Sequence, residues 1–172
     1  SGTWSSGTDM LPPLHALLEE RLYITQGVEI LPENDYLKIF EPDDSIRYSP
    51  FCDDFGPMNL ECIARFIEQL TNEFEEFPDC QFIYSVEDGK RNLTNAIFLV
   101  GAYMIIKQDS SVEEVCASFG WIPSELVEDY RDATHSVPDF VLSLRDCWSG
   151  LAKGKLQGWF AYISEPGGLW EI

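Results

Sequence analysis

Residues 80–107, CQFIYSVEDGKRNLTNAIFLVGAYMIIK, decide the fold of this chain. The first six residues form a short apolar run, which predicts a buried β-strand at residues 80–85. The turn that follows carries two acidic residues and a glycine, and it leads into a segment from about Asn92 to Lys107 that is apolar on nearly every side. A helix without a polar face belongs in the interior of a protein. The stretch therefore predicts a β–loop–α unit, on which α/β proteins build anion-binding sites.

Shorter patterns on both sides of this unit predict the remaining elements. Runs rich in β-branched and aromatic residues predict strands at 21–25, 36–40 and 45–48. Helical spacing and helix-start signals predict a helix that opens at Pro57, a helix with a capping box from Ser111 toward Phe119, an acidic helix over 124–130 and a helix from Asp139, with irregular structure beyond Lys155. Together these patterns indicate an α/β fold with a small central sheet flanked by helices and one buried central helix.

The length and charge of the chain limit its class and its partners. A chain of 172 residues can form one domain that buries roughly 70% of the surface its unfolded form exposes. The first ten residues are rich in Gly, Ser and Thr and are expected to form a flexible tail, which leaves a single domain over residues 11–172. Thirty acidic and eleven basic residues give a formal net charge of −19. Because such a surface repels phosphate backbones and anionic lipids, we expect neither nucleic acid nor membrane as a partner.

The cysteines and the apolar segments indicate the cellular compartment in which the protein is expected. Five widely spaced cysteines in apolar surroundings indicate reduced, buried thiols, which are typical of a cytoplasmic or nuclear protein. A signal peptide consists of a charged segment followed by an apolar one, and this pattern is missing here, so no signal peptide is expected. The longest uncharged apolar run, residues 96–106, is too short to cross a bilayer. Neither a metal nor a cofactor is expected.

The turn after the predicted strand has the spacing of a cysteine-dependent phosphatase loop. In such a loop a thiolate ends the strand, and an Arg that follows after five intervening residues binds the phosphate together with backbone N–H groups. Here Ser85 takes the place of the thiolate, while Arg91 keeps the spacing. A serine hydroxyl is a far weaker acid than a thiol, and neither histidine offers an obvious base. Hydrolysis by this chain is therefore not expected.

This turn is a candidate degenerate phosphate loop, made of Tyr84, Ser85, Glu87, Asp88, Gly89 and Arg91. The carboxylates of Glu87 and Asp88 would lie where a phosphate dianion sits. At ~4 Å and an intermediate dielectric, each such repulsion costs several kcal/mol, which disfavours tight phosphate binding. Arg91 has a simpler alternative role, in which it caps the helix start or pairs with Glu87 or Asp88. No Cys-x5-Arg sequence occurs in the 172 residues.

Several further segments complete a pattern that resembles a known family. They are ERLY at 20–23, DFGPMNL at 54–60, KR at 90–91 followed by NAIFLVGAY at 95–103, and YRDA at 130–133. In this order and separation they resemble the amino-terminal domain of the mitotic-exit dual-specificity phosphatases, the cell division cycle fourteen family. The resemblance covers roughly residues 19–160.

The resemblance implies a fold of the tyrosine/dual-specificity-phosphatase type, with two such domains in tandem in one polypeptide. The carboxy-terminal domain would hold the Cys-x5-Arg site, and the amino-terminal domain would lack it but help to form the substrate cleft. In this register Ser85 stands where the active fold has its Cys, Tyr84 where it has His, and Arg91 where it has the phosphate-binding Arg. The resemblance also implies phosphoprotein substrates with a basic residue after Ser-Pro, and a location in the cytoplasm or nucleus, including centrosome, spindle or cilium.

An acidic groove would recognise that basic residue. We expect acidic side chains near the degenerate loop to form it, namely Glu87, Asp88, Glu125, Glu128 and Asp129. The alternative is a generically acidic surface. Two other functions stay open, a stand-alone pseudophosphatase that binds a protein or phosphoprotein without turnover, and a pure interaction scaffold. Asp54 is expected to cap the helix at Pro57 rather than act as a general acid, and Gly56 and Gly101 are expected to serve turns or packing.

Overall fold

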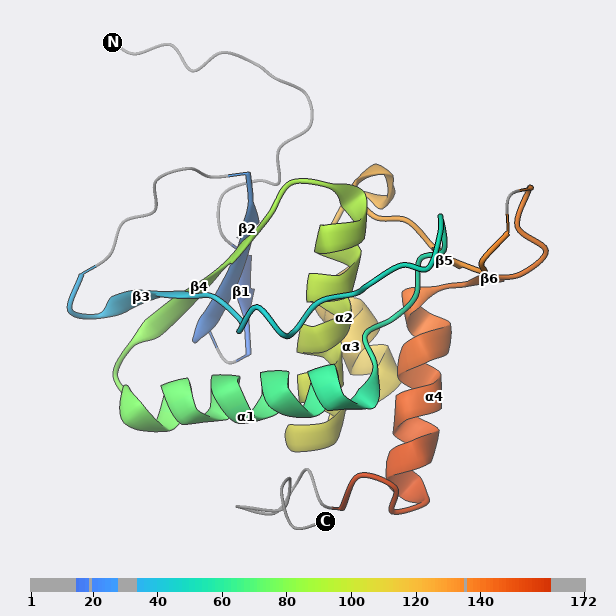
Figure 1. Cartoon of the computed structure of the whole chain (residues 1–172). Helices are drawn as coiled ribbons and strands as arrows, with labels where there is room; N and C mark the ends of the chain where they lie inside the picture. The colour runs from blue at the N-terminus through green and yellow to red at the C-terminus, as the bar shows by residue number, and fades with distance from the viewer. Residues whose placement is uncertain (1–14, 19, 28–33, 135, 162–172) are drawn as a thin grey trace, which may run out of the picture.

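The computed structural model describes residues 15–18, 20–27, 34–134 and 136–161, in which a small sheet lies beside a group of helices (Figure 1). The sheet contains β1 (His15–Leu17), β2 (Leu22–Gln26), β3 (Leu37–Phe40) and β4 (Gln81–Val86). The helices are α1 (Leu60–Glu76), α2 (Lys90–Lys107), α3 (Val112–Ser118) and α4 (Leu144–Leu156). A short 3-10 helix (Ser124–Leu126) precedes a hairpin of β5 (Tyr130–Arg131) and β6 (Val141–Leu142). The predicted α/β class is confirmed, whereas the predicted tail at 1–10 lies outside the described residues.

The main sheet places β4 between two parallel neighbours. The strand order is β1–β2–β4–β3, and β1 pairs antiparallel with β2. Tyr84 on β4 lies opposite Ile24 on β2 and Phe40 on β3, so three strands converge close to the end of β4. This interior position accounts for the apolar sequence of β4, because a parallel strand between neighbours is covered on both faces. The turn after β4 is thereby fixed to the centre of the fold.

Helix α2 is the buried centre of the helical group, as its sequence predicts. Every residue from Leu93 to Ile106 is buried, and the helix lies between the sheet and α4 (Figure 1). Gly101 lets α4 approach closely, since a Cβ at this position would overlap the indole of Trp148. The indole N–H of Trp148 in turn donates to the main-chain oxygen of Phe98 at 3.3 Å. Gly101 is therefore a packing glycine, as expected.

Two of the predicted elements are wrong. Residues 45–48 form no strand, because the chain turns there and the N–H of Ile46 donates to the oxygen of Asp43 at 2.8 Å. Residues 124–130 form no α-helix, because the backbone becomes extended at Val127 after the 3-10 turn. Main-chain hydrogen bonds between Phe55 and Arg131 then hold the extended segment.

The helix starts also differ from the prediction at three places. The cap of α1 is Asn59, whose side chain accepts the N–H of Cys62 at 2.8 Å, so Asp54 does not cap this helix. Helix α4 begins after Ser143, which forms a capping box with Asp146, rather than at Asp139. Helix α2 begins at Lys90, two residues before the predicted start. The capping box predicted at Ser111 is present in α3.

The five cysteines are free thiols, and their burial varies. Cys62 and Cys80 are buried as expected, Cys116 and Cys147 are half-buried, and Cys52 is exposed, which the sequence analysis had wrong. The exposed position follows from the loop that carries Cys52, which lies outside the sheet and helices. Among the described residues, no helix combines the length and the apolar character that crossing a bilayer would need.

A candidate peptide-binding groove

A groove of about 890 Å³ lies beside the turn between β4 and α2. One wall consists of the end of β4, the turn and the first turns of α2, including Ser85, Asp88 and Arg91. The other wall is the segment between β3 and α1, which contributes Asp43 and Tyr48 among others. The groove therefore lies at the predicted degenerate loop, and its second wall is a segment that the sequence analysis did not assign to a site.

The lining of the groove is strongly acidic. It carries six carboxylates and two guanidinium groups, from Glu41, Asp43, Asp44, Asp54, Glu87 and Asp88, and from Arg47 and Arg91. Of the acidic residues expected from the sequence, Glu87 and Asp88 line the groove, whereas Glu125, Glu128 and Asp129 are not among its lining residues. The four further carboxylates come from residues 41–54, and the acidic run at 41–44 was the available signal in the sequence. Such a lining attracts cations and repels anions.

Side chains from β2 and α2 hold the turn between β4 and α2. The side-chain amide of Gln26 donates to the main-chain oxygens of Glu87 at 2.6 Å and Gly89 at 2.9 Å. The amide of Asn92 donates to the oxygen of Asp88 at 2.8 Å. Gly89 has a φ of 116°, which residues with a side chain rarely adopt. The turn is thus fixed by its own neighbours, while the side chains of Glu87 and Asp88 are exposed.

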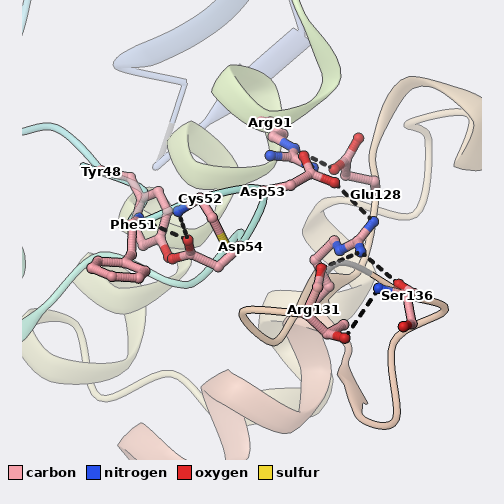
Figure 2. A network of polar contacts seen from close by, with 10 residues as sticks. Tyr48, Phe51, Cys52, Asp53, Asp54, Arg91, Glu128, Arg131 and Ser136 are labelled. Carbon is pink, nitrogen blue, oxygen red and sulfur yellow. Dashed lines mark hydrogen bonds and ion pairs between the residues drawn. The ribbon is translucent and has the colours of Figure 1, made fainter.

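Two carboxylates hold the side chain of Arg91 (Figure 2). Its Nε donates to Glu128 at 2.7 Å, and its Nη2 pairs with Asp53 at 3.2 Å. The guanidinium also lies 5.2 Å from the centre of the Phe55 ring. The simpler interpretation of the sequence paired Arg91 with Glu87 or Asp88. In the structure, its ion-pair partners are Glu128 and Asp53 instead. A phosphate at Arg91 would have to displace two carboxylates, which have the same charge sign as the phosphate.

The ion pairs of Arg91 continue to Arg131. Asp53 accepts from Arg91 with one oxygen and pairs with Nη1 of Arg131 at 3.2 Å through the other (Figure 2). The main chain of Arg131 exchanges two hydrogen bonds with Phe55, at 2.8 and 3.1 Å. The network consequently joins the start of α2, the loop before α1 and strand β5.

The next turn of α2 fixes the same two segments with neutral groups. Thr94 Oγ1 accepts the N–H of Glu128 at 3.1 Å, and Asn95 donates to the oxygen of Gly56 at 3.3 Å. Asn95 also accepts the hydroxyl of Tyr130 at 3.0 Å. Arg91, Thr94 and Asn95 lie three and four residues apart and so share one face of α2. These three polar residues at helical spacing, at the start of a helix that is largely apolar further on, were the signal that the sequence analysis missed.

Replacement of Arg91 by Ala should destabilise the fold by about 1–2 kcal/mol, because it removes two ion pairs and a cation–π contact that are partly shielded from water. Glu128→Gln should cost about 1 kcal/mol, and the double variant less than the sum, since the two side chains interact directly. Urea unfolding of the wild type, the two single variants and the double variant measures the coupling energy between Arg91 and Glu128. Arg145→Ala is the matched control, because the Arg145–Glu113 pair is more exposed and should be worth less than about 0.5 kcal/mol. Equal costs at Arg91 and Arg145 would contradict the structural role of Arg91.

Asp54 accepts three hydrogen bonds at the groove (Figure 2). They come from the hydroxyl of Tyr48 and from the main-chain N–H groups of Phe51 and Cys52, the last two at 2.7 Å each. The bonds from Tyr48 and Cys52 lower the pKa of Asp54 to about 2. Desolvation and the bond to Asp54 raise the pKa of Tyr48 to about 12. Asp54 is therefore ionised at neutral pH and holds its own loop, which is not the protonation state of a general acid.

Tyr48→Phe should raise the pKa of Asp54 from about 2 toward 3.8, without reaching it, because the two N–H donors remain. In the wild-type protein, the contribution of Asp54 to stability is present above pH 3.8 and is lost as the pH falls toward 2. The contribution of Tyr48 is present below pH 10 and is lost as the pH rises toward 12. A carbon-13 NMR titration of Asp54 and unfolding at pH 9 and 11 measure both effects. Tyr36→Phe, at a ring that is 70% exposed, is the control and should change neither.

Comparison with known proteins agrees with this architecture. The model of the family described as "Dual specificity protein phosphatase, N-terminal half" matches residues 16–154. The chain belongs to this family. The resemblance expected from the sequence segments is thereby confirmed, and so is the phosphatase-like fold.

Curated relatives of this dual specificity phosphatase N-terminal half are found in animals and fungi. It is 27% identical over 149 residues to dual specificity protein phosphatase CDC14A of Mus musculus, which covers 84% of this chain and 24% of the mouse protein. It is 27% identical over 157 residues to the tyrosine-protein phosphatase CDC14 homolog of Schizosaccharomyces pombe, which covers 86% of this chain and 28% of the yeast protein. The chain thus spans about a quarter of the length of the curated relatives it matches.

The described residues also bear on metal binding. In the ranges that the structure describes, His, Cys, Asp and Glu side chains nowhere gather in threes in a way that could hold a metal ion. The six acidic residues that line the groove give it a negative surface. What this surface can do chemically is attract a cationic group.

Proposed function

We propose that this chain is the non-catalytic accessory domain of a dual-specificity protein phosphatase, and that its groove binds the basic part of a phosphoprotein substrate. The catalytic Cys-x5-Arg domain would lie elsewhere in the same polypeptide. The observation that carries this proposal is the acidic groove beside the degenerate turn, which six acidic residues and two arginines line. Since one of these guanidinium groups, that of Arg91, already pairs with Glu128 and Asp53, the groove retains a large negative excess.

The state of the degenerate turn supports a role without catalysis. Ser85 has the position of the nucleophile, but a hydroxyl needs a neighbouring base to attack phosphorus. The titratable groups that line the groove with Ser85 are carboxylates, arginines and two tyrosines, Tyr48 and Tyr84, whose pKa values are raised. A protonated phenol is no base, and the groove's carboxylates, which could act as bases, would repel the phosphate dianion that Ser85 would have to attack. The phosphate of a substrate would therefore be bound and hydrolysed on the catalytic domain.

Exposed apolar side chains in two loops support docking of a second domain. Phe51 is 92% exposed, Val137 84% and Phe140 61%. Phe51 lies in the loop that pairs with β5, while Val137 and Phe140 lie in the connection between β5 and β6. Large apolar side chains that are exposed in this way are ones that a docked domain would cover. This favours an accessory domain over a stand-alone pseudophosphatase.

Two peptides test the proposal directly. Both carry phosphoserine followed by Pro, and they differ in one later residue, which is Lys in one peptide and Ala in the other. Fluorescence anisotropy of the labelled peptides with the 172-residue chain should show binding of the Lys peptide, with an affinity that falls steeply between 50 and 200 mM salt. The Ala peptide should bind at least fivefold more weakly. Equal binding of the two peptides, or preference for the Ala peptide, would overturn the proposed function.

A further inference from the structure

The loop between β3 and α1 contains a Ser-Pro dipeptide at Ser49–Pro50, and no other Ser or Thr in the 172 residues precedes a proline. A Ser-Pro pair is the recognition unit of proline-directed protein kinases. We propose that Ser49 is a phosphorylation site for such a kinase, and that a phosphate there strengthens the attraction of the groove for cationic peptides. The first part is independent of the proposed function, and the second part rests on it.

The surroundings of Ser49 give a kinase access to the folded chain. Residues 47–50 belong to no helix, strand or turn, and Ser49 and Pro50 are both exposed. The residue before a proline is biased toward extended backbone, which is the shape in which kinases bind their substrates. Among the described residues, no hydrogen bond involves the Ser49 hydroxyl. Phosphorylation therefore breaks no contact of the hydroxyl.

The ends of this loop are attached firmly to the fold. The ring of Tyr48 packs edge-on against the buried ring of Phe55, with ring centres 6.0 Å apart, and its hydroxyl donates a hydrogen bond to Asp54. The carboxylate of Asp54 accepts the N–H groups of Phe51 and Cys52 (Figure 2). Ser49 and Pro50 lie between these two anchors. A kinase can reach them without separating the loop from the core.

A phosphate at Ser49 would lie on the rim of the groove. The two neighbours of Ser49, Tyr48 and Pro50, both line it. A phosphoserine adds a charge of about −1.5 to −2 at neutral pH. In a water-like dielectric, each unit of this charge at about 7 Å from a bound ammonium group strengthens binding roughly threefold. Arg47, two residues before Ser49, also lines the groove, so the phosphate would also offset the charge of the groove's one arginine besides Arg91.

ATP supplies the phosphoryl group for the modification of Ser49. The Oγ of Ser49 forms a bond to the γ-phosphorus of ATP, and the bond from this phosphorus to the bridging oxygen breaks, so that ADP leaves. The hydroxyl proton passes to the base of the kinase. No group of this chain is needed as a catalyst.

The first experiment incubates the 172-residue chain with ATP and a mitogen-activated protein kinase, which selects Ser-Pro without needing a basic residue further on. Mass spectrometry should find one phosphate per chain, at Ser49, and both Ser49→Ala and Pro50→Ala should lose it. Gly101→Ala, a core variant that raises the unfolded fraction, should be phosphorylated at the wild-type rate. No incorporation into the folded chain, incorporation elsewhere, or a rate that rises with the unfolded fraction would overturn the assignment.

The second experiment measures the Lys peptide described above against the phosphorylated and the unmodified chain. Phosphorylation should tighten binding about threefold or more at low salt, and the gain should shrink at high salt. Unchanged or weaker binding after phosphorylation would overturn the second part of the proposal. If the unmodified chain binds no basic peptide at all, the proposed function fails, while the mass spectrum still decides the modification of Ser49.

Discussion

Gly101→Ala should destabilise the chain by about 2 kcal/mol, although alanine is the better helix residue by about 1 kcal/mol. The added methyl group would overlap the indole of Trp148, which is 3% exposed and stacks on Phe119 with ring centres 5.6 Å apart. Overpacking of this kind costs about 1–3 kcal/mol, because the neighbours leave their preferred rotamers. Here α4 must also move away from α2, which weakens the hydrogen bond from Trp148 to Phe98. Urea unfolding measures the change.

Gly150→Ala is the matched control for this prediction. Gly150 lies inside α4, as Gly101 lies inside α2, but a Cβ at Gly150 would have no atom within 4 Å. The substitution should therefore stabilise the chain, by up to about 1 kcal/mol. The pair of variants separates close packing from helix propensity. A destabilisation of the same size at both positions would contradict the packing of α4 on α2 described above.

Charge reversal of the turn, Glu87→Lys with Asp88→Lys, should weaken the binding of the Lys peptide at least tenfold. Both side chains line the groove and are exposed, so the reversal changes the charge of its rim by four units without removing buried contacts. Each unit charge is worth up to about 1 kcal/mol at short range in water, and less with salt. The anisotropy titration with the Lys peptide, repeated at two salt concentrations, measures the loss.

Glu75→Lys with Glu76→Lys makes the same change in net charge at another place. These two residues form the exposed end of α1 and are not among the residues that line the groove. The control variant should alter the affinity for the Lys peptide less than twofold. If both double variants weakened binding equally, the overall charge of −19 rather than the groove would be responsible, and the alternative of a generically acidic surface would hold.

The elements that the sequence predicted well are those set by local patterns. Strand β4 and helix α2 follow from one continuous apolar stretch, and α3 follows from the capping box at Ser111. The failures at 45–48 and 124–130 have a different origin. A strand needs a partner strand, and the segment at 45–48 has none among the described residues. The segment at 124–130 finds its partners in Phe55 and β6, which no local pattern shows.

The candidate site shows the same division between local and distant information. The turn that carries Ser85 and Arg91 could be placed from the sequence, because both residues belong to the β–loop–α unit. The partners of Arg91 lie 37 and 38 residues away in the chain, at Glu128 and Asp53. Their approach depends on the packing of the loop before α1 and of β5 on the start of α2. For this reason the sequence suggested the nearest carboxylates, Glu87 and Asp88, as partners of Arg91, whereas the structure shows these two lining the groove, where the sequence analysis also expected them.

The most direct test of the account is an NMR titration of the nitrogen-15-labelled chain with two small ligands, trilysine and inorganic phosphate. The groove should prefer the cation, so trilysine should shift the amide signals of Asp43, Ser85 and Asp88, and these shifts should diminish with added salt. Phosphate at the same concentration should leave these signals and the side-chain Nε signal of Arg91 unchanged, because Glu128 and Asp53 hold that guanidinium. Saturable shifts with phosphate at Ser85 and Arg91, without a response to trilysine, would contradict the account.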